Sequence, residues 1–146
     1  LLASVCHLLS MRNTDNSIIG IRSFIVDGAH NPQCVDALMD SLAALYGDKK
    51  LIFLTGVLRD KDWQQMLRRA LPLAKAFVVI TPPSVRALDE NELAAWLNAQ
   101  GVQAVPAKDT DDGVRRALAL AGEDDAICSW GSLYFTGEVR RVLTEQ

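Results

Sequence analysis

The chain has 146 residues, of which 49% are hydrophobic and 23% are charged, and its formal net charge is −3. This length fits one domain that buries about two-thirds of its unfolded surface, and the composition excludes a disordered chain. With only 15 Lys and Arg residues, the chain has no electrostatic footprint for nucleic acid, and it contains no run of about 18 apolar residues that predicts a membrane span.

The start of the chain does not follow the pattern of the rest. Leu1–Leu9 is apolar but lacks the basic start and cleavage site of a signal peptide. Met11–Ser17 is polar and predicts a loop. We therefore expect residues 1–17 to be an irregular segment left from an interdomain region, and residues 18–146 to form one domain. Because the first residue is Leu rather than Met, we expect a longer parent chain.

The first strand and helix are predicted next. Ile21–Val26 is rich in β-branched residues, and Ile18–Phe24 either extends this strand or adds another. Asn31 is a natural N-cap, Pro32 suits the first helical position, and Gly47 ends the helix. One helical face collects the apolar residues Val35, Leu38, Met39, Leu42 and Leu45.

The same alternation continues to the end of the chain. Further strands are expected at Leu51–Leu54, Phe77–Ile80, Val102–Val105 and Ala126–Trp130. Helices between and after them are expected to start near Asp60 or Asp62, at Asp89, at Asp109 and at Ser132. This pattern predicts an α/β fold, a Rossmann-like three-layer αβα arrangement with a mostly parallel sheet of five to six strands. Right-handed crossovers then bring the strand-to-helix loops to one edge, where ligands bind.

The three cysteines predict packing rather than chemistry. Cys6, Cys34 and Cys128 form no CxxC pair and have no His at zinc spacing. We expect reduced thiols, a cytoplasmic setting and no metal site.

The loop from Asp27 to Pro32 has the richest chemistry. It places a carboxylate at a strand end and then His30 and Asn31 at a helix start. A helix N-terminus suits a phosphate or carboxylate, His30 could reach an anionic ligand, and Asp27 could accept from a hydroxyl or a metal-bound water. The structural alternative is that Asn31 caps the helix and Asp27 satisfies loop amides.

Three other loops follow strands at the same predicted edge. Gly131 and Ser132 form either a simple N-cap or a second anion site. The charges in Gly56–Asp62 either form a solvated rim or face a ligand. Arg86 suits phosphate or carboxylate but also suits solvent. The chain contains no GxGxxG, GxxxxGK[ST], HExxH or GxSxG motif, so it cannot cradle a triphosphate through a P-loop.

Together, DGAHNP at 27–32, GVLRDKD at 56–62, RAL at 86–88 and GSLYF at 131–135 resemble a known family. They are similar to the C-terminal domain of folylpolyglutamate synthase / dihydrofolate synthase, in the Mur ligase superfamily, over Ile21 to Leu143. The resemblance implies a Mur ligase C-terminal fold and a cytoplasmic, ATP-dependent and Mg²⁺-dependent amide ligase of folate biosynthesis. ATP would activate a folate or dihydropteroate carboxylate as an acyl phosphate, which the amine of L-glutamate attacks.

The resemblance also implies partners and residue roles. An N-terminal ATPase domain would hold the P-loop, the main Mg²⁺ ligands and the folate, so this chain alone is expected to be inactive. Asp27 and Asn31 would contact ATP, and His30 and Ser132 would bind glutamate. The expected residues at the edge of the site are Arg86, Gly131 and Arg12.

One motif of the family is absent. Family members carry a Pro-Gly-Arg turn about a dozen residues before the Asp, and its Arg contacts ATP phosphates. This chain reads Ser10-Met-Arg12-Asn-Thr-Asp15 there, so Arg12 is near in position but lies in another context.

Two alternative functions stay open. One is a stand-alone, non-catalytic α/β module that binds anions. The other is a Mur-type ligase domain for another amino acid, although His30 favours the folate branch of the superfamily.

Overall fold

The structure is a computed structural model that describes residues 5–12 and 18–145, with side chains described from Ser23 onward. β1 (Val5–Arg12) pairs antiparallel with β2 (Ile18–Val26). The expectation that residues 1–17 are irregular is therefore wrong for residues 5–12, because pairing with β2 makes this segment a strand. The loop expected at Met11–Ser17 falls outside the described residues at positions 13–17.

The rest of the described chain alternates helices and strands as the sequence predicts. The elements are α1 (Pro32–Tyr46), β3 (Leu51–Thr55), α2 (Trp63–Ala70), β4 (Ala74–Val79), α3 (Glu90–Ala99), β5 (Gln103–Pro106), α4 (Thr110–Leu120), β6 (Ile127–Trp130) and α5 (Leu133–Thr144). A short 3-10 turn, Leu71–Leu73, links α2 to β4. The helix N-caps are Asn31, Asp62, Asp89, Asp109 and Ser132. The predicted helix starts are confirmed. The sequence could predict them because each start depends on a local side-chain bond to the first turn of its own helix.

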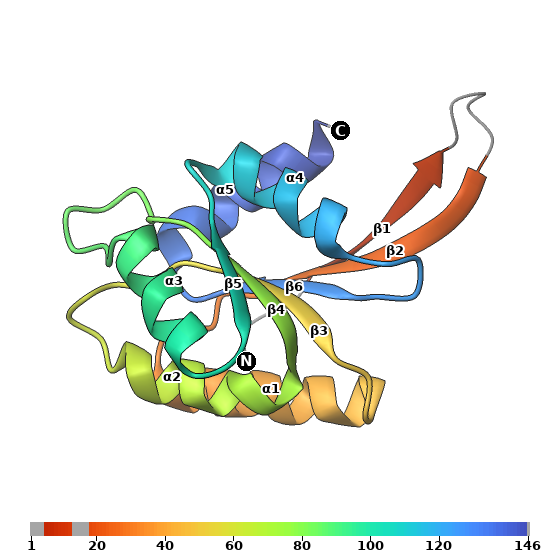
Figure 1. Cartoon of the computed structure of the whole chain (residues 1–146). Coiled ribbons are helices and arrows are strands. Elements are labelled where there is room, and N and C mark those ends of the chain that lie inside the picture. The colour runs from red at the N-terminus through yellow and green to blue at the C-terminus, as the bar shows by residue number, and fades with distance from the viewer. Residues whose placement is uncertain (1–4, 13–17, 146) are drawn as a thin grey trace.

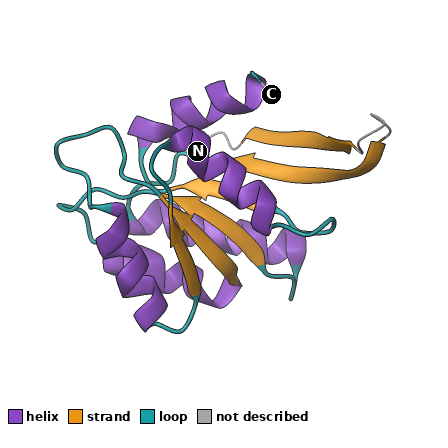
Figure 2. Ribbon diagram, turned by 45° about the horizontal axis from the view of Figure 1, so that its top comes forward, coloured by secondary structure: helices purple, strands orange, loops and turns teal. Residues whose placement is uncertain are grey.

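The sheet has the strand order β1-β2-β6-β3-β4-β5. All neighbours except β1 and β2 are parallel, so the predicted, mostly parallel α/β sheet is confirmed. The last strand, β6, lies between β2 and β3. α1, α2 and α3 cover one face and α4 and α5 the other, which gives the three layers seen in Figures 1 and 2.

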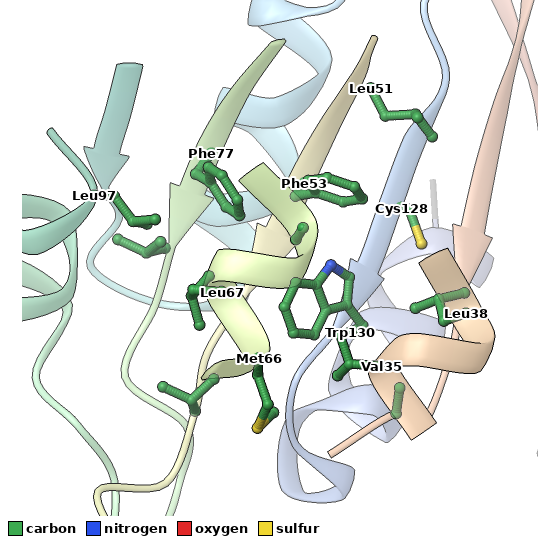
Figure 3. Packing of buried hydrophobic residues seen from close by; sticks show 14 of the residues in the cluster. Val35, Leu38, Leu51, Phe53, Met66, Leu67, Phe77, Leu97, Cys128 and Trp130 are labelled. Carbon is green, nitrogen blue, oxygen red and sulfur yellow. The ribbon is translucent and has the colours of Figure 1, made fainter. Parts of the chain in front are cut away.

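The two faces of the sheet have different cores. On the side of α1 to α3, the aromatic rings of Phe53, Phe77 and Trp130 pack together (Figure 3), with ring centroids 5.4 Å apart for the two Phe residues and 6.0 Å apart for Phe53 and Trp130. On the side of α4 and α5, the buried residues of the strands are mostly aliphatic. Fully burying one large apolar side chain stabilises the fold by about 1.5–3 kcal/mol. The central strands β3, β4 and β6 are thus a rigid base for the loops that follow them.

Candidate functional site

Four loops meet at the carboxyl edge of the sheet. They follow β2, β6, β3 and β4, which are neighbours in that order, and they carry the motifs at 27–32, 131–135, 56–62 and 86–88. Because these strands are parallel, their carboxyl ends lie at the same edge. The prediction that the four motifs share one edge is confirmed.

Backbone contacts join the loops after β2 and β6. The Gly131 N–H donates to the carbonyl of Ala29 at 2.7 Å, and the Asp27 N–H donates to the carbonyl of Ser129 at 2.9 Å. Gly131 has a φ of 122°, and a Cβ at this position would lie 2.4 Å from the carbonyl oxygen of Gly56. Only glycine fits both the conformation and the space. Gly131 therefore lets the loops after β2, β6 and β3 approach one another.

Asp27 and Asn31 both bind the backbone of their own loop. Asp27 is 5% exposed, and its Oδ1 accepts from the Ala29 N–H at 2.8 Å. Asn31 Oδ1 accepts from the Cys34 N–H at 2.9 Å, as an N-cap does. These contacts agree with the structural alternative for both residues. A role for either residue in binding ATP stays a prediction.

His30 is fixed through one ring nitrogen. Its Nδ1 lies 2.9 Å from the carbonyl oxygen of Gly28, which can only accept, so Nδ1 carries a proton. In the neutral ring Nε2 is then an acceptor, whereas in the imidazolium it is a second donor. The ring is therefore held in place with one nitrogen left for another partner.

A cavity of about 350 Å³ opens where the loops meet. It is lined by His30, Leu58, Lys61, Arg86, Ser132, Leu133 and Tyr134. The structure thus brings together the two residues predicted to bind glutamate and one residue predicted at the edge, Arg86. Asp27, Asn31 and Gly131 are not among the lining residues.

Several lining residues lie in the predicted motifs but were given no role of their own. Lys61 lies in the charged loop after β3, for which two interpretations were open, and the cavity favours the one in which a charge faces a ligand. Leu133 and Tyr134 are 56% and 52% exposed although they begin α5. Both belong to the GSLYF motif at the predicted edge, but the sequence assigned neither a role, because only the approach of the neighbouring loops encloses the cavity.

Arg86 is oriented by the loop after β3. Its Nε and Nη2 lie 2.8 and 2.7 Å from Asp60 Oδ2. The two loops are also joined through their backbones, since Arg59 N–H donates to the Arg86 carbonyl at 2.7 Å and Leu88 N–H to the Val57 carbonyl at 2.9 Å. The ion pair is about half exposed and so adds little stability. What the ion pair does is hold the Arg86 guanidinium in one orientation.

The charges at the cavity suit an anionic ligand. Lys61 and Arg86 are cations, and the lining includes no carboxylate. The N-termini of α1 and α5 reach the same loops and add partial positive charge. Ser132 Oγ accepts from the Tyr134 N–H at 3.1 Å, so the hydroxyl proton can be donated to a ligand.

Cys128 takes no part in this chemistry. Burial raises the pKa of its thiol well above the usual value of 9.0, and the nearby charge of Asp27 raises it further. The thiol therefore stays protonated, as expected for a packing residue.

Arg12 lies at the wrong end of the sheet for the predicted edge role. In the register of β1 and β2, Val5 pairs with Val26 and Arg12 with Ile18. Asp27 follows the carboxyl end of β2, whereas Arg12 lies beside its amino end, about 25 Å away at the rise of an extended strand. The expectation that Arg12 borders the site is therefore wrong, because an antiparallel strand runs away from that edge.

The described residues also bear on metal binding and on membrane insertion. They include no group of three or more His, Cys, Asp or Glu side chains placed to hold a metal ion. The Mg²⁺ implied by the resemblance thus has no set of three such ligands among these residues. None of the helices described is long and apolar enough to cross a membrane.

Comparison with curated proteins identifies relatives that are synthases. The chain is 29% identical over 125 residues to a dihydrofolate synthase/folylpolyglutamate synthase of Haemophilus influenzae, covering 83% of the chain and 29% of the relative. It is 30% identical over 123 residues to a folylpolyglutamate synthase of Lacticaseibacillus casei, covering 82% of the chain and 26% of the relative. The chain therefore spans less than a third of the length of either relative.

Comparison with solved structures supports the same fold. A bifunctional folylpolyglutamate synthase/dihydrofolate synthase of Yersinia pestis, complexed with AMPPNP and a Mn ion, matches with a TM-score of 0.74 and 25% identity, over 84% of this chain and 28% of that one. A Mycobacterium tuberculosis folylpolyglutamate synthase complexed with ADP matches with a TM-score of 0.75 and 26% identity, over 83% and 30%. The predicted Mur ligase C-terminal fold is confirmed.

A family model decides the assignment. The model described as "Mur ligase, glutamate ligase domain" matches residues 15–133, which is most of the chain and includes the loops at 27–32, 56–62 and 86–88. This match does not favour either alternative function, the stand-alone anion-binding module or a ligase domain for another amino acid. The chain belongs to the Mur ligase family and corresponds to its glutamate ligase domain.

Proposed function

We propose that this chain is the glutamate ligase domain of an ATP-dependent amide ligase that joins L-glutamate to a folate or a dihydropteroate through an acyl phosphate. The observation that carries the proposal is the cavity that holds His30, Ser132, Lys61 and Arg86. A related Yersinia pestis enzyme has been solved with Mn, AMPPNP and L-glutamate bound, and both curated relatives described above are synthases of this kind.

L-Glutamate fits the cavity chemically. It brings two carboxylates, and the cavity offers the cations Lys61 and Arg86 and the hydroxyl of Ser132. His30, held through Nδ1, presents Nε2 as a further polar contact. Bound in this way, the amino acid is oriented before its amine attacks the carbonyl carbon of the acyl phosphate. Phosphate then leaves as the amide forms, and the amine loses a proton to solvent or a nearby base.

ATP would bind at the border between this chain and an ATP-binding domain of the same protein. Asp27 and Asn31 follow β2 at the same edge and would contact the nucleotide from this side. The other domain would supply the phosphate cradle, Mg²⁺ ligands and folate site that this sequence lacks. Closure of one domain over the other would exclude water from the acyl phosphate. A cytoplasmic setting goes with the proposal, because a free thiol such as Cys34 fits a reducing compartment.

Ligand binding to the isolated chain tests the site. We expect L-glutamate to shift the backbone NMR signals of residues 29–31 and 131–134 in a saturable manner, and His30→Ala or Ser132→Ala to abolish these shifts. Asp89→Ala, which removes an N-cap from α3, is the matched control that leaves them unchanged. Shifts confined to other residues would show that the site is assigned wrongly.

Turnover tests the reaction. The isolated chain is expected to form no ADP with ATP, L-glutamate and dihydropteroate. Joined to the ATP-binding region of the Lacticaseibacillus casei relative, it is expected to support glutamate-dependent ADP formation that His30→Ala lowers by at least about 100-fold, the usual loss for a residue that orients a reactant. Turnover by the isolated chain, or an unchanged rate in the joined His30→Ala protein, would contradict the proposal.

A further inference from the structure

A second cavity lies at the far end of the same sheet edge, beside β5. Its volume is about 430 Å³. It is lined by Glu90, Asn91, Pro106, Ala107, Lys108, Asp112, Arg115 and Arg116. These residues come from the first turn of α3, the end of β5 with the loop after it, and the first two turns of α4. None of them lines the cavity that holds His30 and Ser132.

One buried carboxylate organises this second cavity. Asp112 is 7% exposed. Its Oδ2 accepts from the backbone N–H of Lys108 at 3.1 Å and from Arg116 Nε at 2.9 Å, and its Oδ1 accepts from Arg115 Nη2 at 3.0 Å. The Lys108 N–H bond, followed by the bond from Arg116, lowers the pKa of Asp112 below its usual value of 3.8. The ionised carboxylate therefore fixes the Lys108 loop and both guanidinium groups at one place.

The burial of Asp112 follows from the residue beside it. Gly113 brings α4 so close to the sheet that a Cβ would lie 3.0 Å from both Ile80 Cγ2 and Leu54 Cδ1. This close packing buries Thr110, Asp112 and Gly113 in the first turn of α4, whereas Asp111 faces solvent. The position of the Asp112 carboxylate is thus set by the backbone of α4, and the two exposed arginines are held by their bonds to it.

The arginines keep hydrogen-bond donors for another partner. Asp112 is bonded to one nitrogen of each guanidinium, and each guanidinium carries five N–H donors. The side chains of Arg115 and Arg116 are 68% and 48% exposed. Lys108 adds a third cation to the lining. The cavity therefore offers several donors and an excess of positive charge to anything that enters it.

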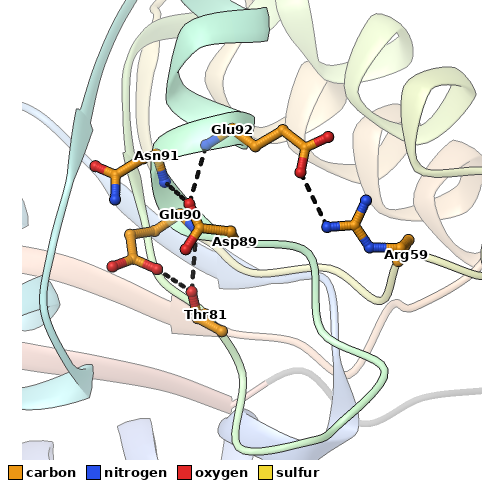
Figure 4. A network of polar contacts seen from close by, with 6 residues as sticks. All are labelled: Arg59, Thr81, Asp89, Glu90, Asn91 and Glu92. Carbon is orange, nitrogen blue, oxygen red and sulfur yellow. Dashed lines mark hydrogen bonds and ion pairs between the residues drawn. The ribbon is translucent and has the colours of Figure 1, made fainter.

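The other carboxylate of the lining is bonded to a neighbouring loop. Glu90 Oε2 accepts from the hydroxyl of Thr81, and the Glu90 N–H donates back to Thr81 Oγ1 at 3.0 Å (Figure 4). Asp89 caps the same helix through the N–H groups of Asn91 and Glu92. The bond to Thr81 holds the Glu90 carboxylate toward the neighbouring loop, and the lining as a whole has three cations against the two carboxylates of Glu90 and Asp112.

We propose that this second cavity binds a small oxyanion, a phosphate or a carboxylate group, through Lys108, Arg115 and Arg116. A planar guanidinium and an ammonium both match such oxygens. The site is separate from the proposed glutamate site, and the inference does not depend on the proposed function.

NMR titration of the isolated chain tests this inference. Sodium phosphate and sodium citrate are added to ¹⁵N-labelled protein in separate series, each against sodium chloride of the same ionic strength. We expect saturable shifts at residues 107–116 with at least one of the two anions but not with chloride. The more effective anion identifies the group that the site prefers. Shifts that match those of the chloride series would overturn the proposal, because they reflect ionic strength alone.

Three variants make the test specific. Lys108→Gln keeps the backbone N–H that Asp112 needs, and Arg116→Gln removes one guanidinium. Each is expected to weaken anion binding about tenfold, which is the usual loss for one charge-assisted hydrogen bond. Arg140→Gln, an exposed change of the same charge on α5, is the matched control and should leave the affinity unchanged. Equal affinities in all three variants would overturn the assignment, and an unchanged pattern of amide signals verifies that each variant is folded.

Discussion

Two cavities lie along one sheet edge, and they are built by different forces. The cavity at His30 and Ser132 is enclosed by loops that backbone hydrogen bonds and a close glycine contact lock together. The cavity at Asp112 is held by an ionised carboxylate with two guanidinium partners. Backbone hydrogen bonds do not titrate and are weakly screened by salt, whereas a charge cluster depends on both pH and ionic strength. The first should therefore respond mainly to steric changes, and the second mainly to changes in charge.

The largest effect is expected from Gly131→Ala. The new Cβ would lie 2.4 Å from the Gly56 carbonyl oxygen and 2.5 Å from Thr55 Oγ1, at a φ of 122°. We expect the free energy of unfolding to fall by about 3 kcal/mol or more, because the loops must separate or the backbone must be strained. Urea unfolding measures this loss, and poor recovery of folded protein is the extreme form of the same result.

Gly137→Ala is the matched control for that experiment. A Cβ at Gly137 has nothing within 4 Å, and the residue lies inside α5. Here alanine should raise the free energy of unfolding by up to about 1 kcal/mol, through its better helix propensity. Equal effects at the two glycines would show that the loops are not locked at Gly131.

The next effect concerns Asp112→Asn and its dependence on pH. The folded pKa of Asp112 lies below the value in the unfolded chain, so in acid the unfolded state takes up the proton first. The stability due to the carboxylate is complete above the unfolded pKa of about 3.9 and is lost as the pH falls through the folded pKa. We expect Asp112→Asn to cost about 2 kcal/mol at pH 7 and progressively less below pH 4.

Asp111→Asn provides the comparison for that pH series. Its side chain is 64% exposed, and its oxygen lies 3.8 Å from Arg141. Urea unfolding from pH 3 to pH 7 should show almost no difference between this variant and the parent chain. A difference for Asp112→Asn that stays constant over the whole range would show that the charge of Asp112 is not what stabilises the loop.

A smaller loss of stability is expected from Ser132→Ala. Removing the bond that the Tyr134 N–H donates to Ser132 Oγ should cost about 1 kcal/mol, as at other N-caps. Asp89→Ala removes the cap of α3 and should cost about the same. The pair separates stability from function, since only Ser132→Ala should also weaken L-glutamate binding. If both variants bind L-glutamate equally well, Ser132 acts only as a cap.

The smallest change in stability is expected from Asp60→Asn. The Asp60–Arg86 pair is about half exposed, so the free energy of unfolding should change by less than about 0.5 kcal/mol. L-Glutamate affinity should nevertheless fall several-fold, because Arg86 loses the contact that orients it. Glu92→Gln, which breaks the pair with Arg59 that is more than half exposed, is the control for charge. Equal affinities in the two variants would mean that Asp60 does not position Arg86.

The features that could be predicted from the amino-acid sequence are local ones. The apolar runs and helical periodicities predicted the order of helices and strands, and Asn31 and Ser132 marked helix starts through bonds to amides two or three residues away. The parallel sheet follows from that order, so the shared edge of the four loops could also be predicted. Each of these depends on residues that are close together in the chain.

Which distant segments of the chain meet could not be predicted and is seen only in the folded protein. The place of β6 between β2 and β3, and the pairing of β1 with β2, depend on backbone hydrogen bonds that no local pattern records. Because of those pairings, Arg12 lies far from the cavity at His30 and Ser132, whereas Lys61 lines it. The burial of Asp112 likewise depends on how closely α4 packs on the sheet at Gly113. The physical reason is that strand pairing and packing distance are set by the summed contacts of the whole core, whereas turns and caps are set by one neighbour.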